Sequence, residues 1–176
     1  GAGCIEFEAD KNAMVVCKRG VPPIFEPDLA ETIARYLDRS LHFTQSTDVL
    51  PGADYIFVTH DVAVDAQDRS NIAIVKKTFD LIRKHAGQKA TIVISSQIPV
   101  GTSRTLVRSL KKRGIDESKV IYFPENLRLG KGFASFLTPD RIILGSDSEG
   151  AMRAFQKDFR FKCPVITMGL ESAEMV

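Results

Sequence analysis

The stretch that decides the fold runs from residue 121 to residue 130 and reads IYFPENLRLG. Its apolar beginning, together with Val120, predicts a short buried strand. Pro124 ends this strand because proline cannot donate to a ladder of backbone hydrogen bonds. Glu125 is then expected just past the carboxyl end of the strand, which is where open α/β sheets bind their ligands. A solvated loop is the alternative interpretation of Pro124 and Glu125.

Working outward from this stretch, apolar runs that predict strands alternate with helical patterns. The predicted strands cover residues 4–8, 41–45, 55–58, 91–95, 120–123, 141–145 and 164–168. Helices are predicted at residues 11–18, after residue 27, at about 72–87 and 103–113, after residue 146 and at 171–176. In the helix after residue 146, we expect Met152, Phe155 and Phe159 to form the buried face. Such alternation is typical of an α/β fold with a doubly wound, mostly parallel sheet.

The composition excludes several classes of protein. The 176 residues suit one domain, and 24 basic against 22 acidic residues leave no basic stripe for nucleic acid. Three cysteines without paired spacing argue against a disulfide framework or a metal site, and Cys17 and Cys163 are expected to be small buried hydrophobes. No apolar run is long enough to span a membrane. We therefore expect a soluble, cytoplasmic protein with no membrane or nucleic-acid partner.

Polar residues after strands are the first candidates for a site. Glu8 ends the first strand, at the place where dinucleotide-binding sheets hold a ribose hydroxyl, although a solvated turn fits equally well. Thr59 ends the 55–58 strand and precedes His60 and Asp61. A His-Asp pair can catalyse proton transfer, but a turn hydrogen bond is the commoner role.

The start of the helix at about residue 103 is a second candidate. Gly101 and Thr102 offer backbone N–H groups and the positive end of a helix dipole, which favour an anionic or dipolar ligand. An ordinary N-cap is the alternative. Glu125, near this helix start, would serve as a base or position a water molecule.

Five short motifs occur in order along the chain, and together they resemble those of one family. They are GVPPIFEPDL (20–29), SQIPVGT (96–102), PENLRLG (124–130), PDRIILG (139–145) and SAE (172–174). They resemble segments of the NAD-binding domain of the UDP-glucose/GDP-mannose dehydrogenase family. The resemblance implies a Rossmann-like fold and an enzyme that oxidises the 6-hydroxyl of a nucleotide sugar to a carboxylate with two NAD.

The resemblance also assigns residues to roles. By position, Glu8, Thr59 and Gln97 would bind the cofactor, and Glu125 and Gln97 would be catalytic. No metal is implied. The substrate-binding positions would be Glu125, Asn126, Leu127 and Arg128, with the backbone to Gly130 bordering the sugar nucleotide. The implied partner is a nucleotide-sugar substrate, with a UDP-sugar favoured, and the parent enzyme would be a homo-oligomer active in polysaccharide biosynthesis.

The sequence departs from the family pattern in several places. Gln97 stands where the family has a catalytic threonine, His60 replaces a proline, and Leu129 replaces an acid. The resemblance begins just before the family's second strand, so the first strand, its G-x-G-x-x-G turn and its helix have no counterpart. Nor does the nucleophilic cysteine of the middle domain. Without them, we expect the chain alone to be inactive and to bind NAD weakly.

Residues 1–170 are therefore predicted to be an incomplete NAD-binding domain, and residues 171–176 the start of a helix toward a middle domain. Because the missing strand is central in this fold, we expect either a rearranged strand in its place or further residues before Gly1. A truncated, non-catalytic nucleotide-binding or assembly module of the same fold is the alternative function. A hydroxyacid-type dehydrogenase is a weaker one, since the motifs at residues 20–29 and 124–130 belong to the nucleotide-sugar family.

Overall fold

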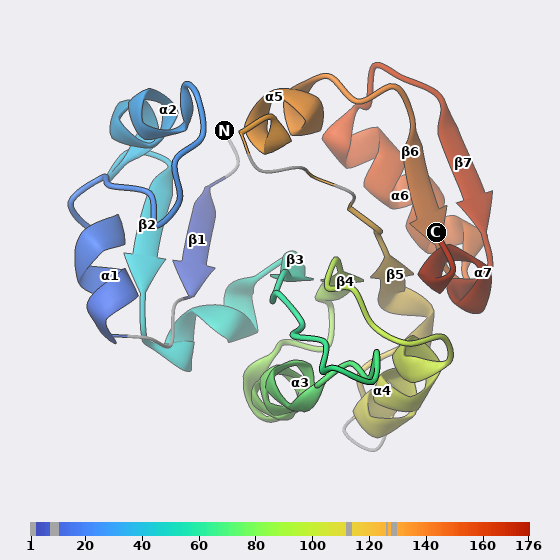
Figure 1. Cartoon of the computed structure of the whole chain (residues 1–176). Helices are drawn as coiled ribbons and strands as arrows, with labels where there is room; N and C mark the ends of the chain where they lie inside the picture. Colours follow the sequence, from blue (N-terminus) through green and yellow to red (C-terminus); the bar gives the residue numbers. More distant parts are fainter. Residues whose placement is uncertain (1–2, 8–10, 112–113, 126, 128–129) are drawn as a thin grey trace. The chain divides into compact units, whose positions relative to one another are not determined.

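The computed structural model describes residues 3–7, 11–111, 114–125, 127 and 130–176. The chain forms two compact units, and each contains its own sheet (Figure 1). The first unit consists of Gly1–Val49 and Asn126–Pro139, and the second of Leu50–Glu125 and Asp140–Val176. The chain thus leaves the second unit after Glu125, contributes a short segment to the first unit, and returns.

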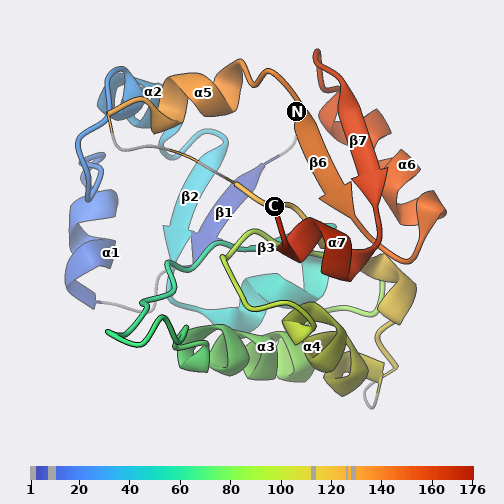
Figure 2. The same cartoon turned by 45° about the vertical axis from the view of Figure 1, so that its right-hand side comes forward.

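The first unit is built on two parallel strands, β1 (Cys4–Phe7) and β2 (Leu41–Thr44). Its helices are α1 (Lys11–Cys17), α2 (Leu29–Tyr36) and α5 (Gly132–Leu137). Helix α1 lies beside β2 (Figures 1 and 2). A parallel pair needs a crossover connection, and α1 and α2 supply it. The strands predicted at 4–8 and 41–45 are confirmed, each one residue shorter.

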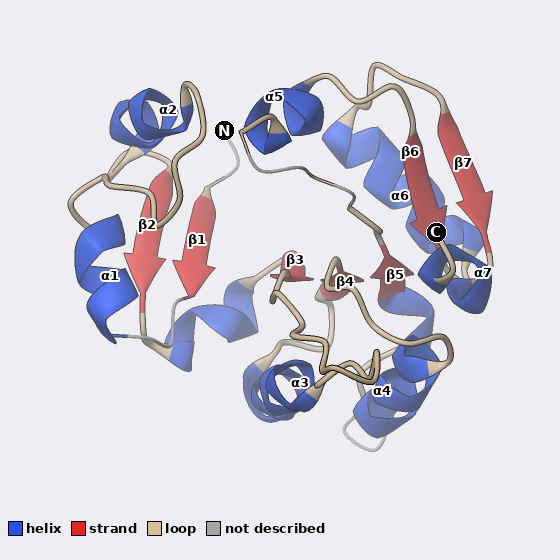
Figure 3. Cartoon of the chain, viewed as in Figure 1, coloured by secondary structure: helices blue, strands red, loops and turns tan. Residues whose placement is uncertain are grey.

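The second unit alternates strands and helices (Figure 3). Its elements are η1 (Thr47–Gly52, shared with the first unit), β3 (Tyr55–Val58), α3 (Ala73–His85), β4 (Thr91–Ile94), α4 (Thr102–Lys111), η2 (Glu117–Lys119), β5 (Val120–Tyr122), β6 (Ile142–Gly145), α6 (Glu149–Phe159), β7 (Val165–Met168) and α7 (Leu170–Glu174). The strand order is β3-β4-β5-β6-β7, and only the β5–β6 pair is antiparallel. The predicted α/β class with a mostly parallel sheet is confirmed.

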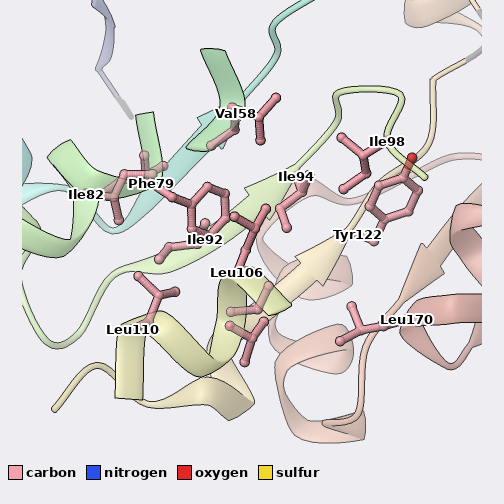
Figure 4. Packing of buried hydrophobic residues seen from close by; sticks show 14 of the residues in the cluster. Val58, Phe79, Ile82, Ile92, Ile94, Ile98, Leu106, Leu110, Tyr122 and Leu170 are labelled. Carbon is pink, nitrogen blue, oxygen red and sulfur yellow. The ribbon is translucent and has the colours of Figure 1, made fainter. Parts of the chain in front are cut away.

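The main core covers one face of this sheet. Alternate residues of β3, β4 and β5 pack against α3, α4 and α7, as Figure 4 shows. The fully buried members include Phe79 and Ile82 of α3 and Leu110 of α4. Burying each such side chain stabilises the fold by about 1.5–3 kcal/mol. This core keeps the ends of β3, β4 and β5 in fixed positions.

The opposite face packs against α6 through Met152 and Phe155, as predicted. Phe159 differs from the prediction, because it is 42% exposed. It is the last residue of α6 and meets Tyr55 and Phe57 of β3, with ring centroids 5.2 and 5.7 Å away. Strand β3 is the outer strand of this sheet in the described part of the chain, so the far side of the Phe159 ring stays open.

Two further expectations differ from the structure. Helix α5 was not predicted, because its six residues leave Phe136 and Leu137 more than half exposed and show no core-facing pattern. In the described residues, β1 pairs only with β2 and β3 only with β4. A rearranged strand of this chain, expected between them, is therefore not found in the part that the structure describes.

Candidate functional site

The ends of β3, β4 and β5 are held level by hydrogen bonds that continue beyond the strands. The Ser95 amide donates to the Val58 carbonyl, and the Phe123 amide donates to the Ile94 carbonyl, both at 2.8 Å. The Ser95 hydroxyl, which is buried, donates to the Phe123 carbonyl at 2.8 Å. Because the three strands are parallel, the residues that follow them leave the sheet at the same edge.

Three of the predicted site residues leave the sheet at this edge. Thr59 directly follows β3 and is exposed, Gln97 lies three residues after β4 and is exposed, and Glu125 lies three residues after β5 and is half-buried. The arrangement gives a hydroxyl, an amide and a carboxylate on adjacent strand ends. Such groups can orient a planar ring and accept a proton from a hydroxyl or a water molecule.

A pocket of about 540 Å³ lies in the second unit beside Gln97. This volume is within the range of small-molecule sites, roughly 300–1,000 Å³. The residues that line it come from the loop after β3 and the loop after β4: Val62, Val64, Asp68, Arg69, Ser70, Gln97, Ile98 and Pro99. Sequence reasoning treated residues 62–70 only as a polar loop, because no local pattern showed that they enclose Gln97.

The start of α4 binds an anion, as its sequence suggested, but the anion belongs to the chain itself. The Glu174 carboxylate of α7 accepts hydrogen bonds from the Gly101 amide at 2.5 Å and the Ser103 amide at 2.7 Å. Gly101 adopts a φ of +84°, which favours glycine. The same carboxylate, after burial as the larger cause, raises the pKa of Tyr122. These amides are therefore not free for an external phosphate.

A cluster of charges fixes α7 against the same helix. Arg104 of α4 donates through Nε and Nη2 to both carboxylate oxygens of Glu171, and through Nη1 to Asp147 at 2.7 Å. Hydrogen bonds from Arg104 lower the pKa of Glu171 to about 2. The guanidinium pKa is raised in turn by its bonds to both carboxylates. This bidentate geometry is the strong form of an ion pair.

His60 is turned toward α3. Its Nε2 lies 2.6 Å from the Thr78 hydroxyl oxygen, and the ring is half-buried. This contact attaches the loop after β3 to the helix that follows. A structural hydrogen bond was the commoner interpretation of His60, and its partner proves to be on α3 rather than in the turn.

The remaining candidates lie elsewhere. Glu8, Asn126 and Arg128 fall outside the described residues, and Leu127 is 44% exposed in the first unit. Sequence reasoning missed Glu26, which is 6% exposed. Its position in a proline-rich connection suggested only a spacer, although an acid in an apolar segment is a signal that could have found it.

Two searches of the described residues gave no candidate. No group of three or more histidines, cysteines, aspartates or glutamates in that part of the chain could hold a metal ion. Across the same residues, no helix combines the length and the apolar character that crossing a membrane requires.

A parallel sheet with polar strand ends beside a pocket defines a Rossmann-type nucleotide-binding domain. The sequence model of the UDP-glucose/GDP-mannose dehydrogenase family, NAD binding domain, matches residues 3–160. The chain therefore belongs to this family and corresponds to its NAD-binding domain.

Individual relatives agree with this assignment. The chain is 29% identical over 174 residues to UDP-glucose 6-dehydrogenase TuaD of Bacillus subtilis, covering 96% of the chain and 38% of the relative. It is 30% identical to UDP-glucose 6-dehydrogenase YwqF of the same organism, covering 98% and 40%. The chain thus spans about two fifths of the length of these relatives.

Solved structures share the fold. The structure of GDP-mannose dehydrogenase from Pseudomonas aeruginosa matches with a TM-score of 0.90 and 18% identity, covering 99% of this chain and 43% of the other. UDP-D-ManNAc dehydrogenase from Pyrococcus horikoshii also has a TM-score of 0.90, with 21% identity and the same coverage. At these identities the similarity concerns the fold alone.

Proposed function

We propose that this chain is the NAD-binding domain of a UDP-sugar 6-dehydrogenase of the UDP-glucose type. The complete enzyme would oxidise the sugar 6-hydroxyl to a carboxylate and reduce two NAD. The observation that carries the proposal is the set of polar residues on adjacent strand ends, Thr59, Gln97 and Glu125, in a chain of this family. The two Bacillus relatives named as UDP-glucose 6-dehydrogenases support the choice of sugar nucleotide.

The residues present fit one end of the cofactor. NAD, when bound, would accept a hydride from the sugar carbon. Exposed Thr59 and Gln97, with the pocket beside Gln97, suit its nicotinamide end, and Glu8 would bind a ribose hydroxyl. The start of α4 does not suit the pyrophosphate, because Glu174 occupies the Gly101 and Ser103 amides.

Glu125 and Gln97 are the proposed catalytic residues. Converting an alcohol to a carboxylate adds one oxygen atom, which water supplies, and releases protons at each oxidation. The Glu125 carboxylate would hold this water and accept a proton from it, and Gln97 would orient the reacting oxygen by hydrogen bonding. Substrate would also contact the segment that contains Asn126, Leu127 and Arg128. By the same resemblance we place the complete enzyme in the cytoplasm as a homo-oligomer.

The test is Glu125→Gln in the complete enzyme. Removing the base should lower turnover of UDP-glucose about 100-fold or more. Glu149→Gln, an exposed carboxylate on α6 whose side chain is 79% accessible, is the matched control and should leave turnover unchanged. Circular dichroism checks that both variants fold. Wild-type turnover in Glu125→Gln would return Glu125 to a solvated loop and favour a non-catalytic module.

A further inference from the structure

Glu26 is the only charged side chain that is buried among the described residues. It lies in the first unit, in the extended connection between α1 and α2, directly before Pro27. Removing a carboxylate from water is costly unless hydrogen bonds replace its hydration. An apolar side chain of similar size would avoid this cost. The burial therefore asks for a role that a carboxylate performs.

The carboxylate holds a turn that is more than a hundred residues away in the sequence. Its Oε1 accepts from the Gly130 amide at 2.5 Å, and its Oε2 accepts from the Phe133 amide at 3.4 Å. Gly130 has a φ of +79°, and Phe133 is the second residue of α5. Each oxygen thus fixes one backbone group at the point where the chain turns into α5.

The turn is shaped to fit this carboxylate. A Cβ atom added at Gly132 would lie 3.4 Å from the Leu127 Cβ and 3.6 Å from the Glu26 Oε1. The glycine therefore lets the backbone approach both neighbours closely. Hydrogen bonding and packing together leave the Gly130–Gly132 turn little freedom to move.

Residues 124–130 are therefore held at both ends. At one end, within the second unit, the Phe123 amide and carbonyl are bonded to Ile94 and Ser95. At the other end, within the first unit, Gly130 is bonded to Glu26. Between these points lie Glu125 and the segment that the proposed function assigns to the nucleotide sugar.

We propose that Glu26 is a positioning residue for this substrate-binding segment. It acts through the Gly130 and Phe133 amides, without touching substrate, and it sets where the backbone after Glu125 runs. The inference rests on the proposed function. Positioning of this kind is costly to lose, because a misplacement of about 1 Å can reduce a rate about 100-fold. An anchor that served only the stability of α5 would leave substrate affinity unchanged.

The test compares Glu26→Ala and Glu26→Gln in the complete enzyme, with UDP-glucose and NAD as substrates. Glu31→Gln is the matched control, since it removes an exposed carboxylate of α2 in the same unit, 3.0 Å from Arg35. We expect the KM for UDP-glucose to rise about tenfold in Glu26→Ala, which loses both hydrogen bonds, and less in Glu26→Gln, which keeps one acceptor. The KM for NAD and the control should stay unchanged.

Hydrogen exchange of the Gly130 and Phe133 amides gives a second readout that does not depend on activity. Protection of both amides should fall in Glu26→Ala. If protection falls while the KM for UDP-glucose stays at the wild-type value, Glu26 is only a structural anchor and the positioning role is overturned. An equal rise in both KM values would overturn it as well, because it would indicate general loosening. If the wild-type enzyme oxidises no nucleotide sugar although both amides are protected, the proposed function itself fails, and the positioning role fails with it.

Discussion

Each of the two units uses a carboxylate to hold backbone amides at the start of a helix, but the helices differ in what else supports them. In the second unit, half-buried Glu174 binds the start of α4, whose ten residues also bury Leu106, Val107 and Leu110 in the core. In the first unit, Glu26 binds the turn into α5, a helix of six residues in which only Gly132 is buried.

The difference concerns what the hydrogen bonds must do. Short helices are marginal in water, so α5 depends on contacts from outside itself. Helix α4 gains most of its stability from the apolar face that it packs on the sheet, and Glu174 adds to this. A similar pair of hydrogen bonds is therefore expected to matter more in the unit with the smaller core.

The largest expected effect comes from Gly145→Ala. A Cβ atom at Gly145 would lie 2.4 Å from the Ala173 Cβ, so the substitution must push α7 off β6. We expect a loss of about 3 kcal/mol in the free energy of unfolding, measured with urea. Because α7 carries Glu174, the Gly101 and Ser103 amides should also lose protection from hydrogen exchange.

Gly150→Ala is the matched control for this substitution. Its added Cβ would meet nothing closer than the Ser148 Oγ at 3.7 Å. Since Gly150 lies in α6, alanine there should stabilise the chain by about 0.5–1 kcal/mol. Unchanged stability in Gly145→Ala would mean that α7 does not pack where the structure places it.

The next effect is the difference between Glu26→Ala and Glu174→Ala. Removing Glu26 leaves two amides beside a buried space, at an expected cost of about 2–3 kcal/mol. Removing half-buried Glu174 should cost only about 1 kcal/mol, because water can reach the freed amides. Urea unfolding of both variants measures the difference, with the exposed Glu31→Ala as a control that should change little. Equal losses would contradict the dependence on core size.

The smallest effect is the pH dependence of the ion pair on α7. Its bonds to Arg104 lower the pKa of Glu171 from 4.5 to about 2, so this contribution to stability is present above pH 4.5 and is lost as the pH falls toward 2. Both side chains are more than a third exposed, and solvent screening should limit the contribution to about 1 kcal/mol or less. The stability difference between wild type and Glu171→Gln should shrink over this window. A constant difference would show that the pair does not titrate.

The sequence alone was enough for the sheet and for the edge at which the site lies. The apolar runs at residues 55–58, 91–95 and 120–123 become the buried strands β3, β4 and β5, and polar residues follow each one. These predictions succeed because strand formation depends on a local pattern of buried side chains. The placement of Thr59, Gln97 and Glu125 follows from parallel strand direction, while their roles remain predictions.

Other features depended on tertiary contacts. Helix α5 was missed because Glu26, 104 residues before Gly130, supports the turn that starts it. Phe159 was placed in the core because its spacing fits the buried face of α6, yet it lies over an outer strand with one side open.

What the sequence determined by itself is the α/β class, the order of the strands along the chain and the edge of the sheet that carries Thr59, Gln97 and Glu125. What only the tertiary structure decided is which carboxylate meets which amides. The motif around Glu26 looks like a stiff connection, and the helix start at Gly101 looks like an open anion site that Glu174 in fact fills. The physical reason is that local patterns report burial and backbone preference. A hydrogen bond between residues 70 to 100 positions apart forms only where the folded chain brings donor and acceptor together.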